Sequence, residues 1–558
     1  MISNYRFLDP KHYIWGLTVL VVMILNVYPF IWLFAGSIWG EEGFTTENFI
    51  DAFVVFDFSG VFLNTVIFSL GTTLIGMGLG TFVAFATART NIYGKKFIRY
   101  ISILGFVSPP WINAMGYVFL LGPRAGWVNN FLDSLIGIRP FDIYTLSGMI
   151  FVSSLFTYSL VFILISKALE NIDSSFEEAA LVSGASKLST VMRITLPLIK
   201  PSLITALVFS LISGFAMFAV PAILGIPSRT YVFATQLYRL MNTFPPALGA
   251  SAAIAVMFTL LAVVIGVLMI LYQNRVIAGK YAVVEGKGSR IKPFEINYRW
   301  LLSLVCFMIV FIALIVPYSV VLLMSFSKSI ALDFSLDNLT LGNYYFLLFD
   351  FRNMWNSVEN TLVIGFTAAT GAVLLSAIIA YIQIRTRLFY RHFLNIIVML
   401  TLIVPSSALV IGFVWGWIRP PFQIYGTIWL IAIAFIARYI PLATRNASDG
   451  LQQISVSLEE AAYVCGAGWL RTFFRVILPL MKPVLIGVFL IVFLSSIRDL
   501  LIPMFLGGGA ARTMTMPVAA FTLWGHSQLG EAAALTILMA ILTLIVFIPL
   551  EKFITARL

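Results

Sequence analysis

The sequence predicts an all-α membrane protein with twelve transmembrane helices, arranged as two parallel repeats of six. Of its 558 residues, 60% are hydrophobic and 11% are charged, whereas a soluble domain has about 25% charged residues. Twelve apolar segments each have the roughly 20 residues that a helix needs to cross a bilayer. In addition, a segment of 25 residues recurs 282 positions later in the chain.

The apolar segments set the order of the predicted spans. The first six are expected at about 13–38, 62–87, 98–121, 144–167, 203–225 and 250–273, and the second six at about 300–325, 361–384, 393–417, 425–443, 484–506 and 532–554. Continuous apolar runs exclude a barrel, whose strands alternate in polarity. The first run is too long for the apolar core of a signal peptide, so we expect it to remain as a span.

Lysine and arginine predict the orientation. With the N-terminus in the cytoplasm, cytoplasmic segments hold 25 of these residues and external loops hold 8, which is the bias expected of cytoplasmic loops. Both termini are therefore expected in the cytoplasm. The net charge of +11 follows from these loops and does not indicate nucleic acid binding. The predicted domains are a first half at 1–274, a basic cytoplasmic linker at 275–298 and a second half at 299–558.

The repeat shows that the halves are equivalent. Residues 177–201 read EEAALVSGASKLSTVMRITLPLIKP, and residues 459–483 read EEAAYVCGAGWLRTFFRVILPLMKP, with 15 identical positions. Six spans per half is an even number, so both halves enter the membrane from the same side. They are therefore related by an axis along the membrane normal. Such a pair is expected to enclose one central path.

The repeated segment is predicted to form a cytoplasmic loop between the fourth and fifth spans of each half. Ser175 and Ser457 each precede a glutamate by three residues, which is the spacing of a capping box at a helix start. Gly184 and Gly466 permit a turn, and Pro197 and Pro479 are expected to end the element that follows. A plain interhelical loop is the alternative. However, loops without a constraint vary, whereas this loop is the best-matched stretch of the two halves.

The spacing E-A-A-x-x-x-G, nine residues, I-x-L-P resembles the coupling-loop motif of the permeases of binding-protein-dependent ABC importers of type I. The first copy has Glu178, Ala179, Ala180, Gly184, Ile194, Leu196 and Pro197, and the second has Glu460, Ala461, Ala462, Gly466, Leu478 and Pro479, with Val476 in place of isoleucine. This resemblance implies that each loop inserts into one of two cytoplasmic ATPase subunits, which bind ATP and magnesium. It also implies an external substrate-binding protein and a bacterial inner membrane.

The fused form looks like the ferric-ion transport permeases. The stretches 121–126, LGPRAG, and 143–150, IYTLSGMI, are similar to that group. The resemblance implies ferric iron as the substrate. Thiamine, phosphonates, sugar phosphates and polyamines, which related permeases carry, remain open.

Candidate path residues lie in the matched fifth and eleventh spans. Pro221 and Pro503 are expected to kink or break these helices, or to pack only. Arg498 and Asp499 are costly within a bilayer, by about 2.5–3.5 kcal/mol for a charge at its centre. They are therefore expected to line the path, or to form a structural ion pair or cap. Arg438 of the tenth span is expected to extend to the interface or to pair with Asp499.

The sequence contains no nucleotide-binding G-x-x-x-x-G-K-S/T loop and no catalytic constellation. The three histidines and two cysteines lack the spacing of metal ligands. We therefore expect no catalytic residue, metal or cofactor on this chain. An ion-coupled secondary transporter is a second hypothesis, but it requires intramembrane acids, of which Asp499 is the clear case. A membrane enzyme or scaffold is a third, although it leaves the repeated loops unexplained.

Overall fold

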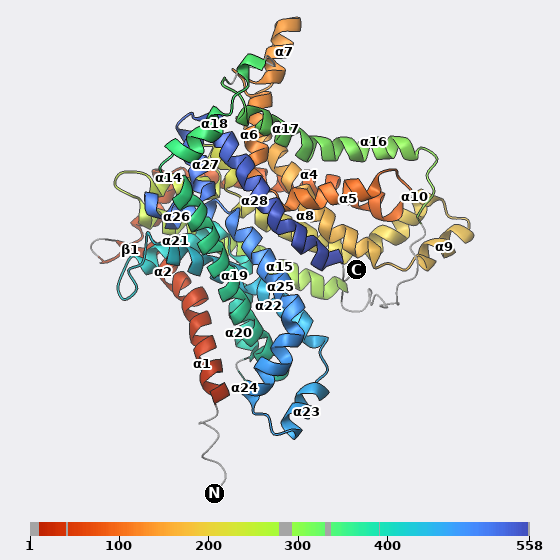
Figure 1. Cartoon of the computed structure of the whole chain (residues 1–558), viewed down its shortest axis with the longest axis vertical. Helices are drawn as coiled ribbons and strands as arrows, with labels where there is room; N and C mark the ends of the chain where they lie inside the picture. Colours follow the sequence, from red (N-terminus) through yellow and green to blue (C-terminus); the bar gives the residue numbers. More distant parts are fainter. Residues whose placement is uncertain (1–9, 41–42, 278–292, 330–335, 390, 556–558) are drawn as a thin grey trace.

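The computed structural model describes residues 10–40, 43–277, 293–329, 336–389 and 391–555. Apart from a short hairpin, these residues fold as helices and connecting loops (Figure 1). The hairpin pairs β1 (Trp39–Gly40) with β2 (Gly43–Phe44). The linker predicted at 275–298 lies mostly outside the described residues.

The elements of the two halves follow one another in the same order. The first half contains α1 (Pro10–Val22), η2 (Met23–Val27), α2 (Tyr28–Ile38), α3 (Glu47–Val54), α4 (Phe58–Arg89), α5 (Lys95–Val107), α6 (Pro110–Leu121), α7 (Trp127–Ile136), α8 (Leu146–Glu170), α9 (Ser175–Val182), α10 (Lys187–Thr190), η3 (Val191–Thr195), α11 (Leu196–Leu198), α12 (Lys200–Ala216), α13 (Ala219–Leu224), α14 (Phe233–Met241) and α15 (Leu248–Ile277). The second half contains α16 (Arg299–Val310), η4 (Phe311–Ile315), α17 (Val316–Ser325), η5 (Leu336–Asn338), α18 (Gly342–Tyr345), η6 (Phe346–Asp350), α19 (Met354–Arg385), α20 (Arg391–Ile403), α21 (Ser406–Trp417), α22 (Ile428–Gln452), α23 (Ser457–Val464), α24 (Trp469–Thr472), η7 (Phe473–Ile477), α25 (Leu478–Ile497), α26 (Leu501–Leu506), η8 (Ala511–Thr513), α27 (Met516–Gly525) and α28 (Leu529–Thr555).

Among the described residues, ten helices are long and apolar enough to cross a membrane, and the number reaches twelve if each of two bent pairs is one span. The bent pairs are α5 with α6, at 101°, and α20 with α21, at 110°. The segments predicted as continuous spans at 98–121 and 393–417 are therefore broken. The breaks coincide with Pro109 and Pro405, because a proline excludes the helical conformation of the residue before it.

Four π-helical turns each lie directly before an X-Pro pair. They are η2 before Pro29, η3 before Pro197, η4 before Pro317 and η7 before Pro479. A proline ring clashes with the carbonyl four residues earlier, and a π turn, which is wider, removes that contact. The prediction that Pro479 ends the preceding element is wrong, because α25 continues through it to Ile497. In the first half, α11 ends at Leu198, one residue after Pro197, and α12 begins at Lys200.

The first span of each half packs on the other half. Helix α2 lies against α21, and α17 lies against α6. Both contacts depend on a glycine: a Cβ at Gly116 would lie 2.7 Å from Pro317, and one at Gly412 would lie 2.4 Å from the Pro29 carbonyl oxygen. The helix backbones are therefore in direct contact at these glycines. The first span of each half packs against the broken third span of the other half.

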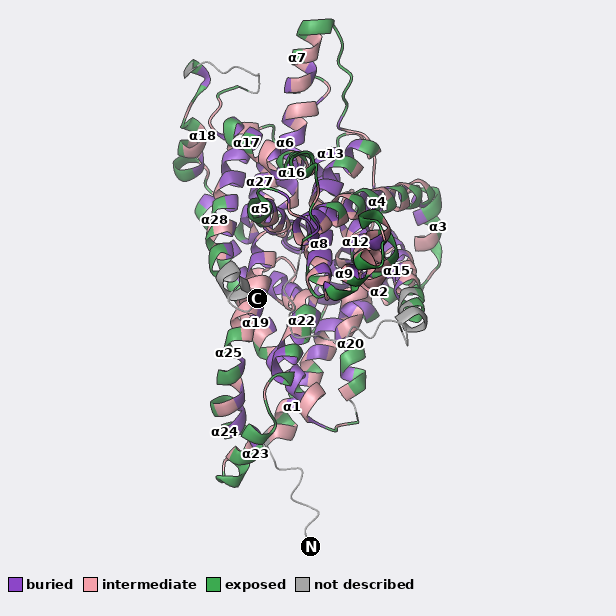
Figure 2. Cartoon of the chain, turned by 90° about the vertical axis from the view of Figure 1, so that its right-hand side faces the viewer, coloured by how far each residue is buried: buried purple, intermediate pink, exposed green. Residues whose placement is uncertain are grey.

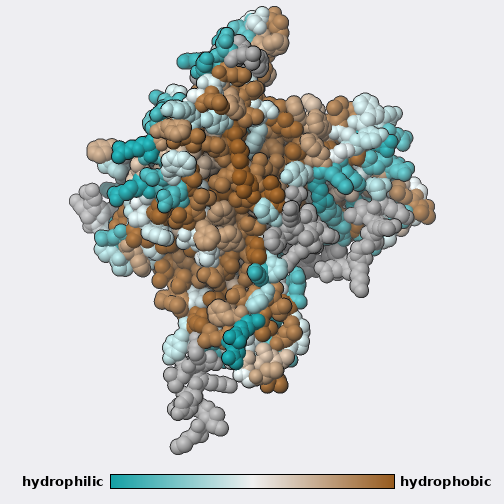
Figure 3. Space-filling view, viewed as in Figure 1, coloured by the Kyte–Doolittle hydropathy of each residue, from teal (hydrophilic) through white to brown (hydrophobic). Residues whose placement is uncertain are grey.

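The helices of the two halves diverge toward α9 and α23. In Figure 1, α4, α5 and α8 run to the right toward α9, whereas α19, α22 and α25 run downward toward α23. Buried residues concentrate where the halves meet, and α9 and α23 are mostly exposed (Figure 2). Apolar surface covers the middle of the molecule, and hydrophilic surface lies near α9 and α10 and on the opposite side around α18 (Figure 3). This pattern is that of a membrane-spanning body with two polar ends.

Candidate coupling loops and translocation path

The two repeated loops have the same fold. Each contains a helix of eight residues, α9 or α23, followed by a glycine turn and a four-residue helix, α10 or α24. The capping boxes predicted at Ser175 and Ser457 are wrong, because these serines are the first helical residues. Their own backbone N–H groups are satisfied from upstream, by Asp173 Oδ1 at 2.9 Å and Ser455 Oγ at 3.3 Å.

Both predicted glycines sit in the left-handed region of the backbone. Gly184 has φ +85° and Gly466 has φ +79°, and a Cβ at either position would meet nothing within 4 Å. Glycine is therefore required by the backbone and not by crowding, since L-residues rarely adopt this conformation. The turn directs the second short helix back toward the membrane-spanning body.

The first glutamate of each loop anchors it to the body of its own half. In the first half, Glu177 is buried, and Arg89 at the end of α4 approaches it with Nη1 at 3.4 Å from Oε2. Thr195 donates to Glu177 Oε1 at 2.7 Å, and Arg89 Nη2 donates to the Ile172 carbonyl at 2.8 Å. Arg89 therefore joins the last turn of α4 to the start of the loop, and Glu177 joins that start to Thr195 near the end of the loop.

The second half repeats this Arg–Glu anchor with different hydrogen-bond partners. Arg385, at the end of α19, donates from Nε to Glu459 Oε1 at 2.7 Å and from Nη2 to the Leu451 carbonyl at 3.2 Å. Tyr381 donates to Glu459 Oε2 at 3.3 Å. Sequence reasoning missed both arginines. The available signal was that Arg89 and Arg385 are 296 positions apart, like Pro109 and Pro405.

The remaining motif residues lie on the outside of the loops. Glu460, Ala179 and Ala461 are exposed, whereas Glu178, Ala180 and Ala462 are half-buried. Large apolar side chains surround them on the same loops: Phe176, Val182, Leu188 and Met192 in the first half, and Val456, Leu458, Tyr463, Val464, Leu470 and Phe474 in the second. Val182 and Val464, the last residues of α9 and α23, are 89% and 87% exposed.

The fifth and eleventh spans break four residues before the matched prolines. Helix α12 ends at Ala216, before Met217, and α25 ends at Ile497, before Arg498 and Asp499. Because a proline clashes with the carbonyl four residues earlier, Pro221 disfavours a continuous helix at Met217, and Pro503 disfavours one at Asp499. Both prolines are buried in the short helices α13 and α26 that follow.

Arg498 connects two helix breaks that belong to different halves. Its Nη1 donates to the carbonyls of Phe106 and, at 3.2 Å, Ser108, and its guanidinium lies over the Phe106 ring, 5.3 Å from the centroid. These carbonyls lie at the end of α5, where the α5–α6 break leaves them without helical partners. Asp499 accepts from the Ile502 N–H at 2.9 Å and so caps α26. The structure thus gives both residues capping contacts.

Arg438 makes a similar contact at the other bent pair. Its Nη1 donates to the Thr401 carbonyl, near the end of α20, at 3.1 Å. Within the described residues Arg438 has no ion pair within 4 Å, so the predicted pair with Asp499 is not formed. Arg438, Arg498 and Asp499 are all half-buried. Arg438 lies within the candidate span Ile428–Gln452, whereas Arg498 and Asp499 directly follow the candidate span that ends at Ile497.

Aromatic side chains close the space between the halves next to α13 and α26. The ring of Phe218 lies 5.7 Å from that of Phe505 in the opposite half, and Tyr238 lies 5.6 Å from Phe218 and 5.9 Å from Phe505. Phe218 and Phe505 are 3% and 2% exposed. These three rings, which we call the aromatic closure, lie on the side of the molecule opposite to α9 and α23.

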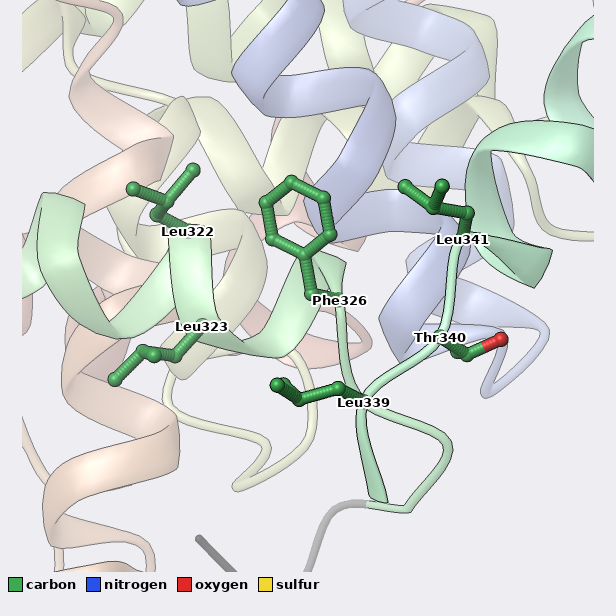
Figure 4. A pocket seen from close by; sticks show the side chains of 6 residues that line it. All are labelled: Leu322, Leu323, Phe326, Leu339, Thr340 and Leu341. Carbon is green, nitrogen blue, oxygen red and sulfur yellow. The ribbon is translucent and has the colours of Figure 1, made fainter. Parts of the chain in front are cut away.

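Two surface pockets lie outside this region. One, of about 460 Å³, is lined by Leu322, Leu323, Phe326, Leu339, Thr340 and Leu341 (Figure 4); it has no charged group that would hold a polar cargo. The other, of about 360 Å³, includes Asp57, Arg229 and Arg239 and lies in the first half. Among the described residues, no three His, Cys, Asp or Glu side chains are grouped to hold a metal ion.

Comparison with known proteins gives the same result for both halves. The family described as binding-protein-dependent transport system inner membrane component matches residues 76–278 and 372–554. The chain is 26% identical over 509 residues to the ferric transport system permease protein FbpB of Actinobacillus pleuropneumoniae, covering 89% of this chain and 72% of that protein.

Two further likenesses differ in extent. A putative 2-aminoethylphosphonate transport system permease protein, PhnV of Salmonella typhimurium, is 27% identical over 205 residues, which cover 36% of this chain and 74% of that protein. Among solved structures, a bacterial alginate ABC transporter in complex with a pentasaccharide-bound periplasmic protein matches with a TM-score of 0.42 and 23% identity, over 48% of this chain and 96% of that chain.

Proposed function

We propose a cargo and a set of partners for this chain, which belongs to the family of binding-protein-dependent transport system inner membrane components. It is an ABC importer permease, a transport subunit whose two halves each carry the family's domain. The match to both halves confirms the resemblance drawn from the loop motif, and the helical fold confirms the predicted class. The partners, the cargo and the orientation of the termini go beyond these findings.

The first proposed partners are two cytoplasmic ATPase subunits, one for each coupling loop, which bind the ATP and magnesium. The observation that carries this proposal is the exposed apolar face of α9 and α23, held on a buried Arg–Glu anchor. Exposed apolar groups gathered on an ordered element are typical of a protein interface. The anchors make each loop a rigid extension of its own half, so that closure of the ATPase pair would be transmitted to α4 and α19.

The termini are proposed to lie on this cytoplasmic side. Trp15 of α1 contacts Trp469 of α24, with ring centroids 5.8 Å apart. The last part of the linker also lies near a coupling loop, because Lys187 donates to the Glu295 carbonyl. The excess of lysine and arginine in these segments favours the cytoplasm.

An external substrate-binding protein is the second proposed partner, and family membership is its main support. The structure adds α7, which projects from the surface next to α6 (Figure 1). Phe131, Leu135 and Ile136 on this helix are 58%, 63% and 62% exposed. We expect α7 to contact the binding protein, because the external loop of the second half at 418–427 contains no such helix.

Ferric iron is the proposed cargo, since ferric permeases match the chain over most of its length. The test is uptake of radiolabelled ferric iron by iron-starved cells with and without the gene, with 2-aminoethylphosphonate uptake measured in parallel. Loss of iron uptake on deletion supports the proposal. Unchanged iron uptake together with loss of phosphonate uptake would replace ferric iron by phosphonate and leave the importer assignment intact.

The coupling role is tested in the same cells with the Gly184→Asp, Gly466→Asp double variant. We expect loss of uptake and of ATPase co-purification, because an aspartate places a charge at each turn, within the surface proposed to dock on the ATPase. Normal uptake in this variant would contradict the proposed role of the loops.

A further inference from the structure

The structure places Arg498 and Arg438 against backbone carbonyls at the two bent pairs. Helices α5 and α20 each have 13 residues before their breaks, which corresponds to about 20 Å of helix. The carbonyls that Arg498 and Arg438 contact therefore lie well inside the two apolar bent pairs, each of which is long enough to cross a bilayer core of about 30 Å. Non-helical backbone at that depth is found where it is buried in protein or lines a cavity.

Both guanidinium groups keep donors that no group of the described residues accepts. Arg498 and Arg438 each use Nη1 alone for carbonyl contacts. Their Nε and Nη2 atoms have no acceptor among the described residues, and protein atoms do not fully enclose them. A guanidinium presents five N–H donors in a planar fork, so most of this donor capacity is left for a ligand.

The acid next to these arginines does not cancel their charge. Asp499 lies within electrostatic range of both guanidinium groups, but it forms no ion pair within 4 Å with either and accepts a backbone N–H of α26. The described cluster therefore has two positive charges and one negative charge. Tyr318, whose hydroxyl contacts Ser108, and Tyr439 add polar groups beside it.

We propose that Arg438 and Arg498 form an anion-binding constriction of the translocation path, which binds anionic oxygens of the cargo during passage. The proposal rests on the proposed function, because it assumes that cargo passes between the two halves. Arginine binds carboxylate and phosphate oxygens in a bidentate manner. Because Fe³⁺ is a hard cation that takes anionic oxygen ligands, a ferric complex and a phosphonate both present this chemistry, whereas a bare cation would be repelled.

The position of the constriction fits this role. Arg498 lies three residues before the start of α26, which carries Phe505 of the aromatic closure. A cargo passing that closure would therefore meet the arginines next. The first half has Ala216 and Met217 at the positions that match Arg498 and Asp499, so the constriction is supplied by the second half alone.

The first test measures anion binding by the purified full chain in lipid nanodiscs. Inorganic phosphate, methylphosphonate and citrate are added at constant ionic strength, with chloride as the reference, and the thermal unfolding midpoint is recorded. We expect these anions to raise the midpoint of the native chain and of Arg512→Gln, an exposed external control. The Arg438→Gln, Arg498→Gln double variant should lose the shift, although its amides can still cap the carbonyls. No shift in the native chain, or an equal shift in the double variant, would overturn the proposal.

The second test measures transport in cells with radiolabelled ferric iron and, separately, radiolabelled 2-aminoethylphosphonate. We expect the double glutamine variant to reduce uptake of the true cargo at least tenfold while the ATPase still co-purifies, and the Arg438→Lys, Arg498→Lys variant to retain more. Unchanged uptake in the glutamine variant would refute the constriction. If native cells import no ferric iron but the anion shift is present, the ferric assignment fails and the constriction stands.

Discussion

The buried anchor of the second coupling loop gives the sharpest prediction. In Glu459→Gln, the 2.7 Å contact from Arg385 Nε loses its charge, and a buried guanidinium remains without a counter-ion. A hydrogen bond to a charged group contributes about 1.5–3 kcal/mol, which corresponds to a factor of about 10 to 150 in an equilibrium constant. We therefore expect the amides of α23 to exchange hydrogen faster by about that factor in the purified chain.

The adjacent residue supplies the control. Glu460 is exposed, whereas Glu459 is 4% exposed, so Glu460→Gln should leave exchange in the free chain unchanged even if it weakens ATPase binding. In Glu459→Gln, docking must also order the loop. The binding free energy for the ATPase should therefore weaken by no more than the roughly 1.5–3 kcal/mol that the Arg385 contact contributes. Equal exchange rates in α23 of the native chain and Glu459→Gln would refute the anchor.

Three further predictions concern the loops and a contact outside them. Val182→Asp with Val464→Asp should reduce ATPase association more than tenfold in a pull-down, because a charge is buried in the interface. Phe244→Asp, on a fully exposed residue outside the loops, should have no effect. Gly184→Val should co-purify with less ATPase than Gly184→Asn, since asparagine tolerates the left-handed conformation; equal recovery would show that φ +85° is not the constraint. Asn360→Ala should lower the thermal unfolding midpoint, because Asn360 donates at 2.9 Å to the carbonyls of Arg512 and Met514. The control is Asn446→Ala, which removes a local, exposed hydrogen bond. An equal change of the midpoint in both variants would contradict a stabilising role of the Asn360 contacts.

The sequence predicted the order of the spans and the position of the loops because both depend on local composition. Apolar length marks a span wherever it occurs, and the motif at Gly184 and Gly466 is contiguous. The bend within a span could not be predicted in this way, since hydropathy does not distinguish a straight helix from one bent by 101° at Pro109.

The anchors and the constriction were not predictable because their partners are distant in sequence. Arg385 contacts Glu459 across 74 positions, and Arg498 contacts Phe106 across 392. Arg498 was recognised as unusual from its cost in a bilayer, but no local pattern indicates a carbonyl of the other half as its partner. Arg89 was counted only as a basic loop residue, although it is fully buried at the end of α4.

The coupling loops and the constriction differ in symmetry, and fusion of the halves gives a physical reason. The coupling loops keep 15 of 25 positions identical, as expected if both dock on equivalent subunits. At the constriction, Arg498 and Asp499 of the second half match Ala216 and Met217 of the first half in sequence. In a homodimer every arginine near the axis would face its own copy, and two uncompensated like charges at that depth would repel each other. A fused chain can place a single Arg498 near the axis, where it caps the carbonyls of Phe106 and Ser108 and keeps its remaining donors for a small anion.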